Sequence, residues 1–261
     1  MVDAALDPVR FYDGAYSRHG EQAALYSRWR ALGAVGKADH VLALCARADA
    51  WAGGRPISTL EVGCGDGALL SELRRRGFGG RLAGVEITQS AVAIAAARDE
   101  IHSVELYDGR RLPYGDRAYE LGVLSHVLEH VPDPPALLRE TARVCRAVVL
   151  EVPLEANLSA RRAGKRQHAH EVGHLQRLDR AGARAVVAEA GLLVVAELED
   201  PLPLAVHRFF ARTRRQRARA TAKWALRSGL HRLAPAFARA LFTVHYACLC
   251  LAPGDPALPG R

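Results

Sequence analysis

The spacing of hydrophobic positions divides the chain into a helical beginning and an alternating remainder. Up to about residue 50, apolar side chains recur at helical spacing, as in Leu25, Trp29 and Leu32, and no β-type run occurs. Two glycines and a proline within residues 53–56 end this pattern. We therefore expect residues 1–50 to form a helical N-terminal cover.

Short apolar runs then alternate with stretches of helical periodicity. Strands that alternate with helices of about ten to fifteen residues predict crossover units and a parallel sheet covered on both faces. The predicted strands are residues 58–62, 81–87, 103–107, 120–125, 147–152, 192–198 and 242–251, and the predicted helices are residues 67–76, 89–98, 134–145 and 180–190. The pattern predicts an α/β fold with a doubly wound, mostly parallel seven-stranded sheet, and places residues 51–261 in one domain.

The net charge of +8 is concentrated near the C-terminus. Residues 201–254 contain ten Lys or Arg and no Asp or Glu, whereas the rest of the chain has 26 basic and 28 acidic residues. We expect residues 201–240 to form a basic helical insertion before the last strand. A solvated helix face, a nucleic-acid surface and a membrane-surface or anionic-substrate contact are the alternatives, and we favour a lid over a small, acidic substrate.

The sequence also indicates in which cellular compartment the protein is expected. The first residues lack the apolar core of a secretory signal, and no run of about eighteen apolar residues occurs. The five cysteines are scattered without a C-x-x-C pair, which predicts reduced thiols. We expect a cytoplasmic protein, with peripheral membrane contact as an option and the oligomeric state open.

The most informative stretch is LEVGCGDGALL at residues 60–70. Gly63, Gly65 and Gly67 stand at alternate positions between a predicted strand and helix, where a backbone without Cβ atoms can turn sharply and approach a ligand. Nineteen residues after Gly67, Glu86 ends the next predicted strand, where a carboxylate can accept hydrogen bonds from a ribose diol. The combination predicts a cofactor that contains a nucleoside.

Two cofactor classes fit these glycines. Gly63, Gly65 and Ala68 satisfy G-x-G-x-x-A, so a nicotinamide-dependent oxidoreductase is one alternative. Glu61, two positions before the first glycine, would repel a pyrophosphate but attract an ammonium group. Glu61 therefore favours a cofactor that carries an ammonium group.

Together these residues resemble the class I S-adenosylmethionine-dependent methyltransferases, from about residue 11 to residue 198. Residues 61–67 resemble the first motif, Glu86 the ribose-binding acid, residues 107–114 the adenine-side segment, and residues 119–134 (YELGVLSHVLEHVPDP) the fourth strand and following helix of the small-molecule branch. One departure is that no Pro-Gly-Gly turn follows the helix that ends near Cys145.

The resemblance implies a role for each matching residue, with S-adenosylmethionine as the cofactor of residues 51–261. Glu61 and the glycine loop would hold the methionine part, Glu86 the ribose hydroxyls, and Ile87 the adenine face. Asp108 would accept from the adenine amino group, although Asp108-Gly109 also fits a simple turn, and Ser125 would lie beside the methionine end, although it also fits a helix cap. The predicted cofactor-binding residues are Glu61, Gly63, Gly65, Gly67, Glu86, Ile87, Asp108, Gly109 and Ser125. No metal is expected, because the fold needs none for this chemistry.

Two histidine-rich stretches nevertheless spell metal motifs. His170, Glu171 and His174 form H-E-x-x-H, and residues 126–130 form H-x-x-E-H. A metalloprotease would need both histidines on one stable helix together with a third ligand, and Gly173 lowers helix stability there by about 1 kcal/mol. The H-x-x-E-H stretch also stands where the methyltransferases commonly have that sequence.

Position gives these histidines another role. His126 follows the fourth predicted strand, and His170 and His174 follow the fifth, so both groups belong at the crevice where the methyl group is presented. Methyl transfer is largely a matter of positioning, but a hydroxyl or amine acceptor must also lose a proton, and histidine suits that step. We expect His126, His170 or His174 to act as the base or to orient the substrate; the alternative is that these histidines bond to loop backbone or cap helices.

The sequence therefore predicts a methyltransferase that acts on a small molecule, at oxygen or nitrogen rather than carbon, in specialised metabolism. An RNA-modifying methyltransferase recruited by the Arg-rich segment is one alternative, although nucleic acid is not the expected partner. A fold relative that binds the cofactor without methylating, and the nicotinamide-dependent oxidoreductase, are the others.

Overall fold

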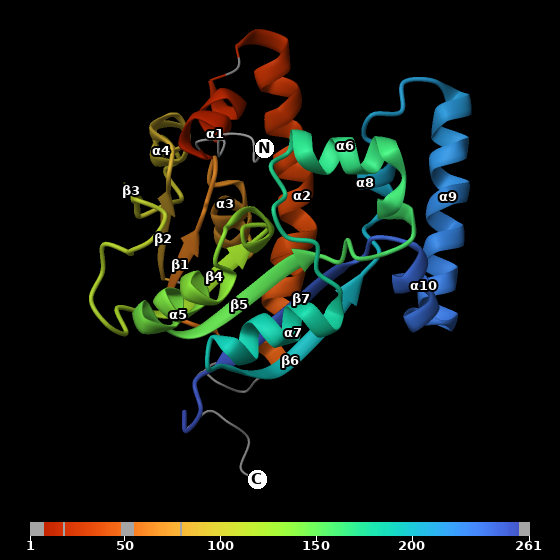
Figure 1. The fold of residues 1–261 in the computed structure, drawn as a ribbon. Helices are drawn as coiled ribbons and strands as arrows, with labels where there is room; N and C mark the ends of the chain where they lie inside the picture. The colour runs from red at the N-terminus through yellow and green to blue at the C-terminus, as the bar shows by residue number, and fades with distance from the viewer. Residues whose placement is uncertain (1–7, 18, 48–54, 79, 256–261) are drawn as a thin grey trace, which may run out of the picture.

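The computed structural model describes residues 8–17, 19–47, 55–78 and 80–255, which are built around one sheet (Figure 1). The strand order is β3-β2-β1-β4-β5-β7-β6. Strands β1 to β5 pair in parallel, and β7 is antiparallel to both of its neighbours. The strands are β1 Ser58–Val62, β2 Arg81–Glu86, β3 Ser103–Leu106, β4 Tyr119–Ser125, β5 Cys145–Pro153, β6 Leu193–Asp200 and β7 His245–Leu251. The predicted doubly wound, mostly parallel seven-stranded α/β fold is confirmed.

Helices cover both faces of the sheet because its strands are apolar on both sides. On β5, Val149 is buried in the core cluster of α2, α3 and α4, whereas its neighbours Val148 and Leu150 belong to the cluster of α5 and α7. These helices are α2 Gly20–Arg47, α3 Ala68–Arg75, α4 Gln89–Ala96, α5 Pro134–Val144 and α7 Arg180–Glu189. Continuous apolar runs are what a sheet buried on both faces requires.

The two N-terminal helices pack against α4 and against the sheet. Helix α1 (Pro8–Tyr16) lies beside α4, where the Ser90 hydroxyl donates to Asp13 Oδ1 at 2.7 Å (Figure 1). Helix α2 packs along the sheet against β5, β6 and β7. Both are helical as predicted, and residues 1–7, 18 and 48–50 of the predicted cover lie outside the described residues. The division into a cover and a catalytic domain remains a prediction.

The structure shows what replaces the Pro-Gly-Gly turn that the sequence lacks after α5. Helix α5 ends at Val144 and β5 begins at Cys145, without an intervening residue. A Cβ on Gly122 of β4 would lie 2.7 Å from Thr141 Cγ2 and 3.0 Å from Cys145 Sγ. Gly122 therefore provides the room in which the helix passes directly into the strand.

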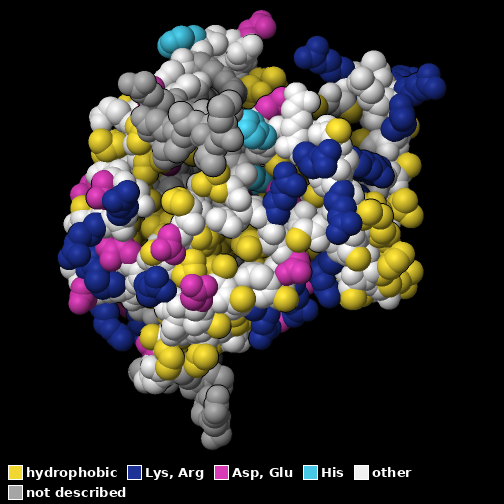
Figure 2. Space-filling view, in the orientation of Figure 1, with side chains coloured by type: hydrophobic (Ala, Val, Ile, Leu, Met, Phe, Trp, Pro, Cys, Tyr) yellow, Lys and Arg dark blue, Asp and Glu magenta, His cyan; other side chains and the backbone are white. Residues whose placement is uncertain are grey.

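Between β6 and β7 stand the helices of the basic segment: α8 Leu204–Arg208, α9 Arg214–Leu233 and α10 Pro235–Leu241. Thr213 and Gln216 form a capping box that begins α9. Trp29 of α2 packs on Phe209 and Phe210, with ring centroids 5.1 and 5.0 Å away, which fixes α8 to the main body. Basic side chains gather over α9 (Figure 2).

The described helices were compared with the length and apolar character that a membrane-spanning helix requires. None of those within the described ranges combines the necessary length with sufficient apolar character.

Candidate functional site

The predicted glycine loop lies between β1 and α3. Gly63, Gly65 and Gly67 have φ of 72°, 54° and 73°, in the left-handed region that favours glycine. A Cβ at Gly63 would lie 2.7 Å from Val127 Cγ2, and one at Gly65 would collide with the Tyr16 hydroxyl. The loop is therefore restricted to glycine both by conformation and by space.

Glu61 lies beneath this loop at the end of β1. Its side chain is buried, and Oε2 has no hydrogen-bond partner in the part of the chain that the structure describes. Burial, with smaller effects from nearby Asp66 and Glu86, raises the pKa of Glu61 to about 8. A buried carboxylate oxygen without a donor is costly, so this position suits a cationic ligand.

Glu86 ends β2 and joins the glycine loop to the residue that follows β2. Its Oε2 accepts from the Gly65 backbone N–H at 2.9 Å, and its Oε1 accepts from the Ile87 N–H at 2.6 Å. Burial raises the pKa of Glu86, whereas these backbone donors lower it. Each carboxylate oxygen can accept a second hydrogen bond, so Glu86 can still bind hydroxyl groups.

Asp108 and Gly109 follow β3 in a turn. Asp108 is exposed, and its Oδ1 accepts from the Arg110 and Arg111 N–H groups at 2.8 Å each. Gly109 has φ of 77°, and a Cβ there would lie 3.5 Å from Ile87 Cγ2. The structure therefore brings Ile87 and Gly109 into contact. Asp108 stabilises the turn, which is the alternative that the sequence offered.

Ser125 ends β4 with a buried hydroxyl. Its Oγ finds no hydrogen-bond partner among residues 8–17, 19–47, 55–78 and 80–255. The alternative prediction of a helix cap is not what the structure shows, because the following 3-10 helix η1 (Leu128–His130) is preceded by Val127 and has no side-chain cap.

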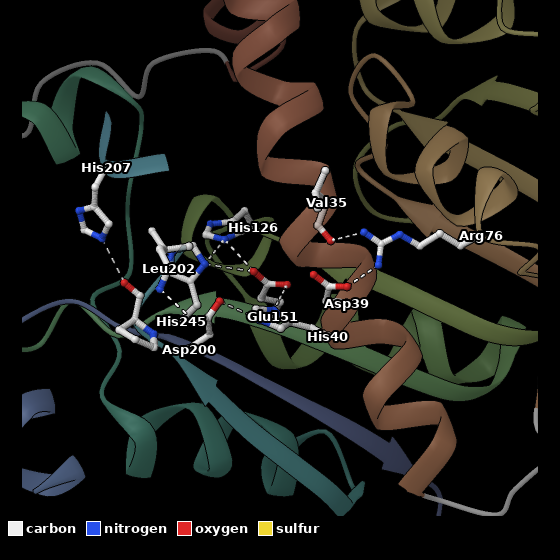
Figure 3. Close-up of polar contacts among 11 residues, drawn as sticks. Val35, Asp39, His40, Arg76, His126, Glu151, Asp200, Leu202, His207 and His245 are labelled. Atoms are coloured by element: carbon white, nitrogen blue, oxygen red, sulfur yellow. Dashed lines mark hydrogen bonds and ion pairs between the residues drawn. The ribbon is translucent and has the colours of Figure 1, made fainter. Parts of the chain in front are cut away.

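His126 belongs to a buried network at the ends of β4, β5 and β7 (Figure 3). Its Nδ1 lies 3.0 Å from Glu129 Oε1, and its Nε2 lies 3.3 Å from Glu151 Oε1 and 3.1 Å from His245 Nδ1. Because the Glu129 carboxylate can only accept, Nδ1 donates to it. The backbone of His126 is held in the left-handed region, with φ of 60°, while its N–H donates to the Glu151 carbonyl.

His40 of α2 extends this network. It bridges Glu151 Oε2 at 3.1 Å and Asp200 Oδ2 at 3.2 Å. Burial alone would lower the pKa of His40, but the hydrogen bonds with Asp200 and Glu151 raise it to about 9. The imidazolium of His40 therefore sits between two carboxylates.

His174 belongs to a second group of polar side chains, which also contains Glu155, His130 and Tyr12. Its Nδ1 lies 2.7 Å from Glu155 Oε2, and its ring meets His130 edge-on at a centroid distance of 4.8 Å. His130 Nδ1 lies 2.6 Å from the Tyr12 hydroxyl, and burial lowers the pKa of His130. Burial, together with the charges of Glu129 and Glu86, raises the pKa of Tyr12.

The H-E-x-x-H stretch does not form a helical metal site. Helix α6 (Ala163–Glu171) ends at Glu171, and Gly173 leaves the helix with φ of 77°. The His170 side chain is exposed, and Glu171 accepts from Gln167 rather than facing His174. His170 and His174 therefore point to different surroundings, although they are four residues apart.

Helices α6 and α9 bring cations together. Burial, together with Arg227, Lys165 and Arg162, lowers the pKa of Lys223. Burial also lowers the pKa of Arg227, whose Nε has no partner in the described part of the chain. Among the described residues, Lys223 and Arg227 form no ion pair with an acidic side chain, and cations held close together in this way favour an anionic ligand.

Sequence reasoning missed several members of the site. Tyr12 and Tyr16 come from α1, His40 from α2, and Asp200 and His245 from strands β6 and β7. The i, i+4 spacing of Tyr12 and Tyr16 could have indicated one helix face. For the others no local signal exists, since they are brought together by the sheet.

Comparison with known proteins identifies the family. A family model described as a methyltransferase domain matches residues 37–197, more than half of the chain. An uncharacterized 37.1 kDa protein in transposon TN4556 of Streptomyces fradiae is 37% identical over 93 residues, covering 34% of this chain and 27% of that protein. A ubiquinone biosynthesis O-methyltransferase of Acinetobacter baumannii (strain ACICU) is 28% identical over 86 residues, covering 31% and 35%. The chain thus spans only about a third of the length of these curated relatives.

A solved structure agrees at the level of the fold. The geranyl diphosphate C-methyltransferase from Streptomyces coelicolor A3(2), determined with Mg²⁺, geranyl-S-thiolodiphosphate and S-adenosyl-L-homocysteine, has a TM-score of 0.58 and 14% identity, covering 83% of this chain and 75% of that one. The cofactor is S-adenosylmethionine, and the nicotinamide alternative is wrong. With its strand order, glycine loop and matched domain, the chain belongs to the class I S-adenosylmethionine-dependent methyltransferases.

Proposed function

We propose that this methyltransferase transfers the methyl group to an oxygen or nitrogen of a small, anionic molecule, in specialised metabolism. The main support for cofactor binding is the buried Oε2 atom of Glu61, which has no hydrogen-bond partner among the described residues. Glu61 comes just before the loop whose backbone conformation requires glycine. S-adenosylmethionine has an ammonium group at the end of its methionine part, and a carboxylate without a donor is its natural counterpart.

The other cofactor contacts follow from the same crevice. In this proposal the loop of Gly63, Gly65 and Gly67 holds the methionine part, and Glu86 accepts from the ribose hydroxyls with the lone pairs that its two backbone donors leave. Ile87 and Gly109, which pack together, line the adenine, and Asp108 retains Oδ2 for its amino group. The buried Ser125 hydroxyl serves the methionine end. When bound, the cofactor supplies the electrophilic methyl group.

For the acceptor we propose that His174 takes the proton. Its Nδ1 is held by Glu155 at 2.7 Å, which fixes the ring and leaves Nε2 for the substrate. Side-chain exposures of 12% for His174 and 20% for Glu155 shield this pair without closing it to a ligand. His126 has both ring nitrogens engaged, so we assign it a positioning role, and His170 remains a prediction of the sequence with an exposed side chain.

A base at the crevice supports oxygen or nitrogen as the acceptor, because both lose a proton on methylation. The related ubiquinone biosynthesis enzyme is an O-methyltransferase, whereas the structural neighbour is a C-methyltransferase. The cations around Lys223 and Arg227 support an anionic substrate.

The test is methyl transfer from S-adenosylmethionine to a panel of small alcohols, phenols and amines with and without carboxylate or phosphate groups, followed by S-adenosylhomocysteine release. Turnover restricted to anionic hydroxy or amino compounds supports the proposal. Calorimetric binding of S-adenosylhomocysteine without turnover of any acceptor would instead favour a fold relative that binds the cofactor without methylating.

One observation keeps an RNA-modifying methyltransferase as the second candidate. Four arginines at the start of α9 are exposed, namely Arg214, Arg215, Arg217 and Arg219, and such a cationic helix can bind phosphates. A gel shift with structured RNA at increasing salt decides between the two. Salt-sensitive retention that is abolished in Arg215→Glu would favour RNA over a small molecule.

A further inference from the structure

Three side chains at the ends of β4, β5 and β7 point their polar atoms at one position (Figure 3). His126 Nε2 and His245 Nδ1 are 3.1 Å apart, and they lie 3.3 and 3.1 Å from Glu151 Oε1. The three atoms therefore form a nearly equilateral triangle. Strand pairing brings the three together: His245 pairs with Pro153, two residues after Glu151 on β5, and His126 follows Ser125, the β4 partner of Glu151.

This triangle has the dimensions of one face of a tetrahedral metal site. Ligands about 2.0–2.1 Å from Zn²⁺ in tetrahedral geometry are about 3.3 Å from one another. Two imidazoles and one carboxylate are also a ligand set that suits Zn²⁺ and other divalent first-row metals, whereas Mg²⁺ prefers oxygen ligands.

Neighbouring groups orient the triangle as they do in metal sites. Glu129 Oε1 accepts from His126 Nδ1 at 3.0 Å, which leaves the lone pair on Nε2 facing the common position. His40 holds the other oxygen of Glu151 at 3.1 Å, and Asp200 holds His40 in turn. Metal-binding histidines and carboxylates are characteristically fixed by such outer partners.

The charge and the access of the cluster also favour a cation. Glu129, Glu151 and Asp200 place three carboxylates around it, against two nearby cations, the imidazolium of His40 and the ammonium group of Lys37. Side-chain exposures of 22% for His126 and 14% for His245 contrast with 3% for Glu151. A fourth ligand can therefore reach the position from the side of the histidines.

We propose that His126, Glu151 and His245 form a binding site for one divalent transition-metal ion, best suited to Zn²⁺, with a fourth position for water or for an oxygen of the substrate. The metal binding stands independently of the proposed function, and only the use of the fourth position for substrate rests on it. The sequence analysis expected no metal. Of the two metal motifs it found, H-E-x-x-H lies outside this triangle, and H-x-x-E-H contributes only His126.

The experiment is a titration of the chelator-treated full-length protein with Co²⁺, which takes the place of Zn²⁺ and reports its ligands by visible absorption. Zn²⁺ then competes for the same site. The expected result is one Co²⁺ per chain, displaced by Zn²⁺ but not by Mg²⁺. His126→Ala and His245→Ala are expected to lose affinity by about a hundredfold or more, and His40→Gln, which acts through Glu151, by about tenfold.

His170→Ala is the matched control, because it removes a histidine of the H-E-x-x-H spelling and none of the triangle. It should retain the affinity of the unaltered protein. Absence of saturable Co²⁺ binding, equal affinity in His245→Ala, or loss in His170→Ala or His174→Ala instead would each overturn the proposal. S-adenosylhomocysteine binding, measured on every variant, shows that the variant is folded. It also separates the two ideas, since cofactor binding can succeed or fail whatever the metal titration shows.

Discussion

Replacing Glu61 by Gln should remove a pH dependence of cofactor binding that the buried carboxyl imposes. In the free protein, burial raises the pKa of Glu61 from 4.5 to about 8, so the group is mostly protonated at neutral pH. In the proposed cofactor site, the ammonium group of the cofactor pairs with the ionised carboxylate of Glu61. Binding must therefore release a proton from Glu61 whenever the pH is below 8.

The magnitude follows from the fraction of protein already ionised. With a pKa of about 8, that fraction is about 1% at pH 6.0 and about 24% at pH 7.5, so affinity for S-adenosylhomocysteine should rise about 25-fold over this interval. The range stops at pH 7.5 because a free α-amino group titrates near 7.7–8.0. Glu61→Gln should bind more weakly at pH 7.5 and show no such rise.

The same carboxyl affects stability with the opposite sign. A raised pKa in the folded state contributes stability that is fully present below pH 4.5 and is lost as the pH rises to 8. The loss amounts to about 1.4 kcal/mol per pH unit, or roughly 5 kcal/mol in all. Without cofactor, denaturant unfolding of Glu61→Gln should therefore be less sensitive to pH between 5 and 8 than that of the unaltered protein.

The assay is isothermal titration calorimetry in two buffers of different ionisation enthalpy, which counts the released proton directly. Glu120→Gln, a carboxyl of β4 that accepts from the Ile57 N–H, is the control and should keep the full pH dependence. A flat affinity profile in the unaltered protein, or the same 25-fold rise in Glu61→Gln, would refute the reasoning and shift attention to Glu86, whose pKa is also raised by burial.

Three further predictions concern the glycine loop, the proposed base His174 and the cations of α6 and α9. Gly65→Ala should weaken S-adenosylhomocysteine binding about tenfold in calorimetry, because a non-glycine residue in the left-handed region costs about 1–2 kcal/mol and its Cβ would collide with the Tyr16 hydroxyl. The control is Gly36→Ala, in open space on α2, which should instead raise the free energy of unfolding by up to about 1 kcal/mol. Once an acceptor is found, His174→Ala should lower kcat by about 10²- to 10⁴-fold while cofactor affinity is kept, whereas His170→Ala should leave kcat unchanged; equal losses in both would contradict the assignment of the base. Pyrophosphate should raise the melting temperature of the protein, and Lys223→Glu should abolish that rise because it reverses a charge in the cation group of α6 and α9; the same rise in both proteins would disconnect Lys223 from anion binding.

The fold could be predicted closely because its signals are local. Apolar runs such as residues 147–152 can be buried only as strands covered on both faces, and β5 occupies Cys145–Pro153. The alternate glycines at 63, 65 and 67 predicted a turn that approaches a ligand, and all three adopt positive φ. These features depend on residues within a few positions of one another, so the sequence alone determined them.

The contacts of the histidines could not be predicted from the local sequence. By sequence, His170 and His174 belong together on one helix, but Gly173 ends that helix and leaves His170 exposed while His174 pairs with Glu155. His126 meets a partner 119 positions away, His245, and His40 meets Glu151 from 111 positions away. No spacing along the chain encodes these contacts.

The sequence by itself thus determined the strands and the glycine loop, because these follow from periodicity and from the conformational freedom of glycine, and its motifs indicated the family. Only the tertiary structure decided which polar side chains share a site. Parallel strands bring their carboxyl ends to one edge of the sheet, and β7, inserted antiparallel between β5 and β6, brings the beginning of a strand there as well. His245 at that beginning therefore meets His126 and Glu151 at the ends of β4 and β5, through strand order alone.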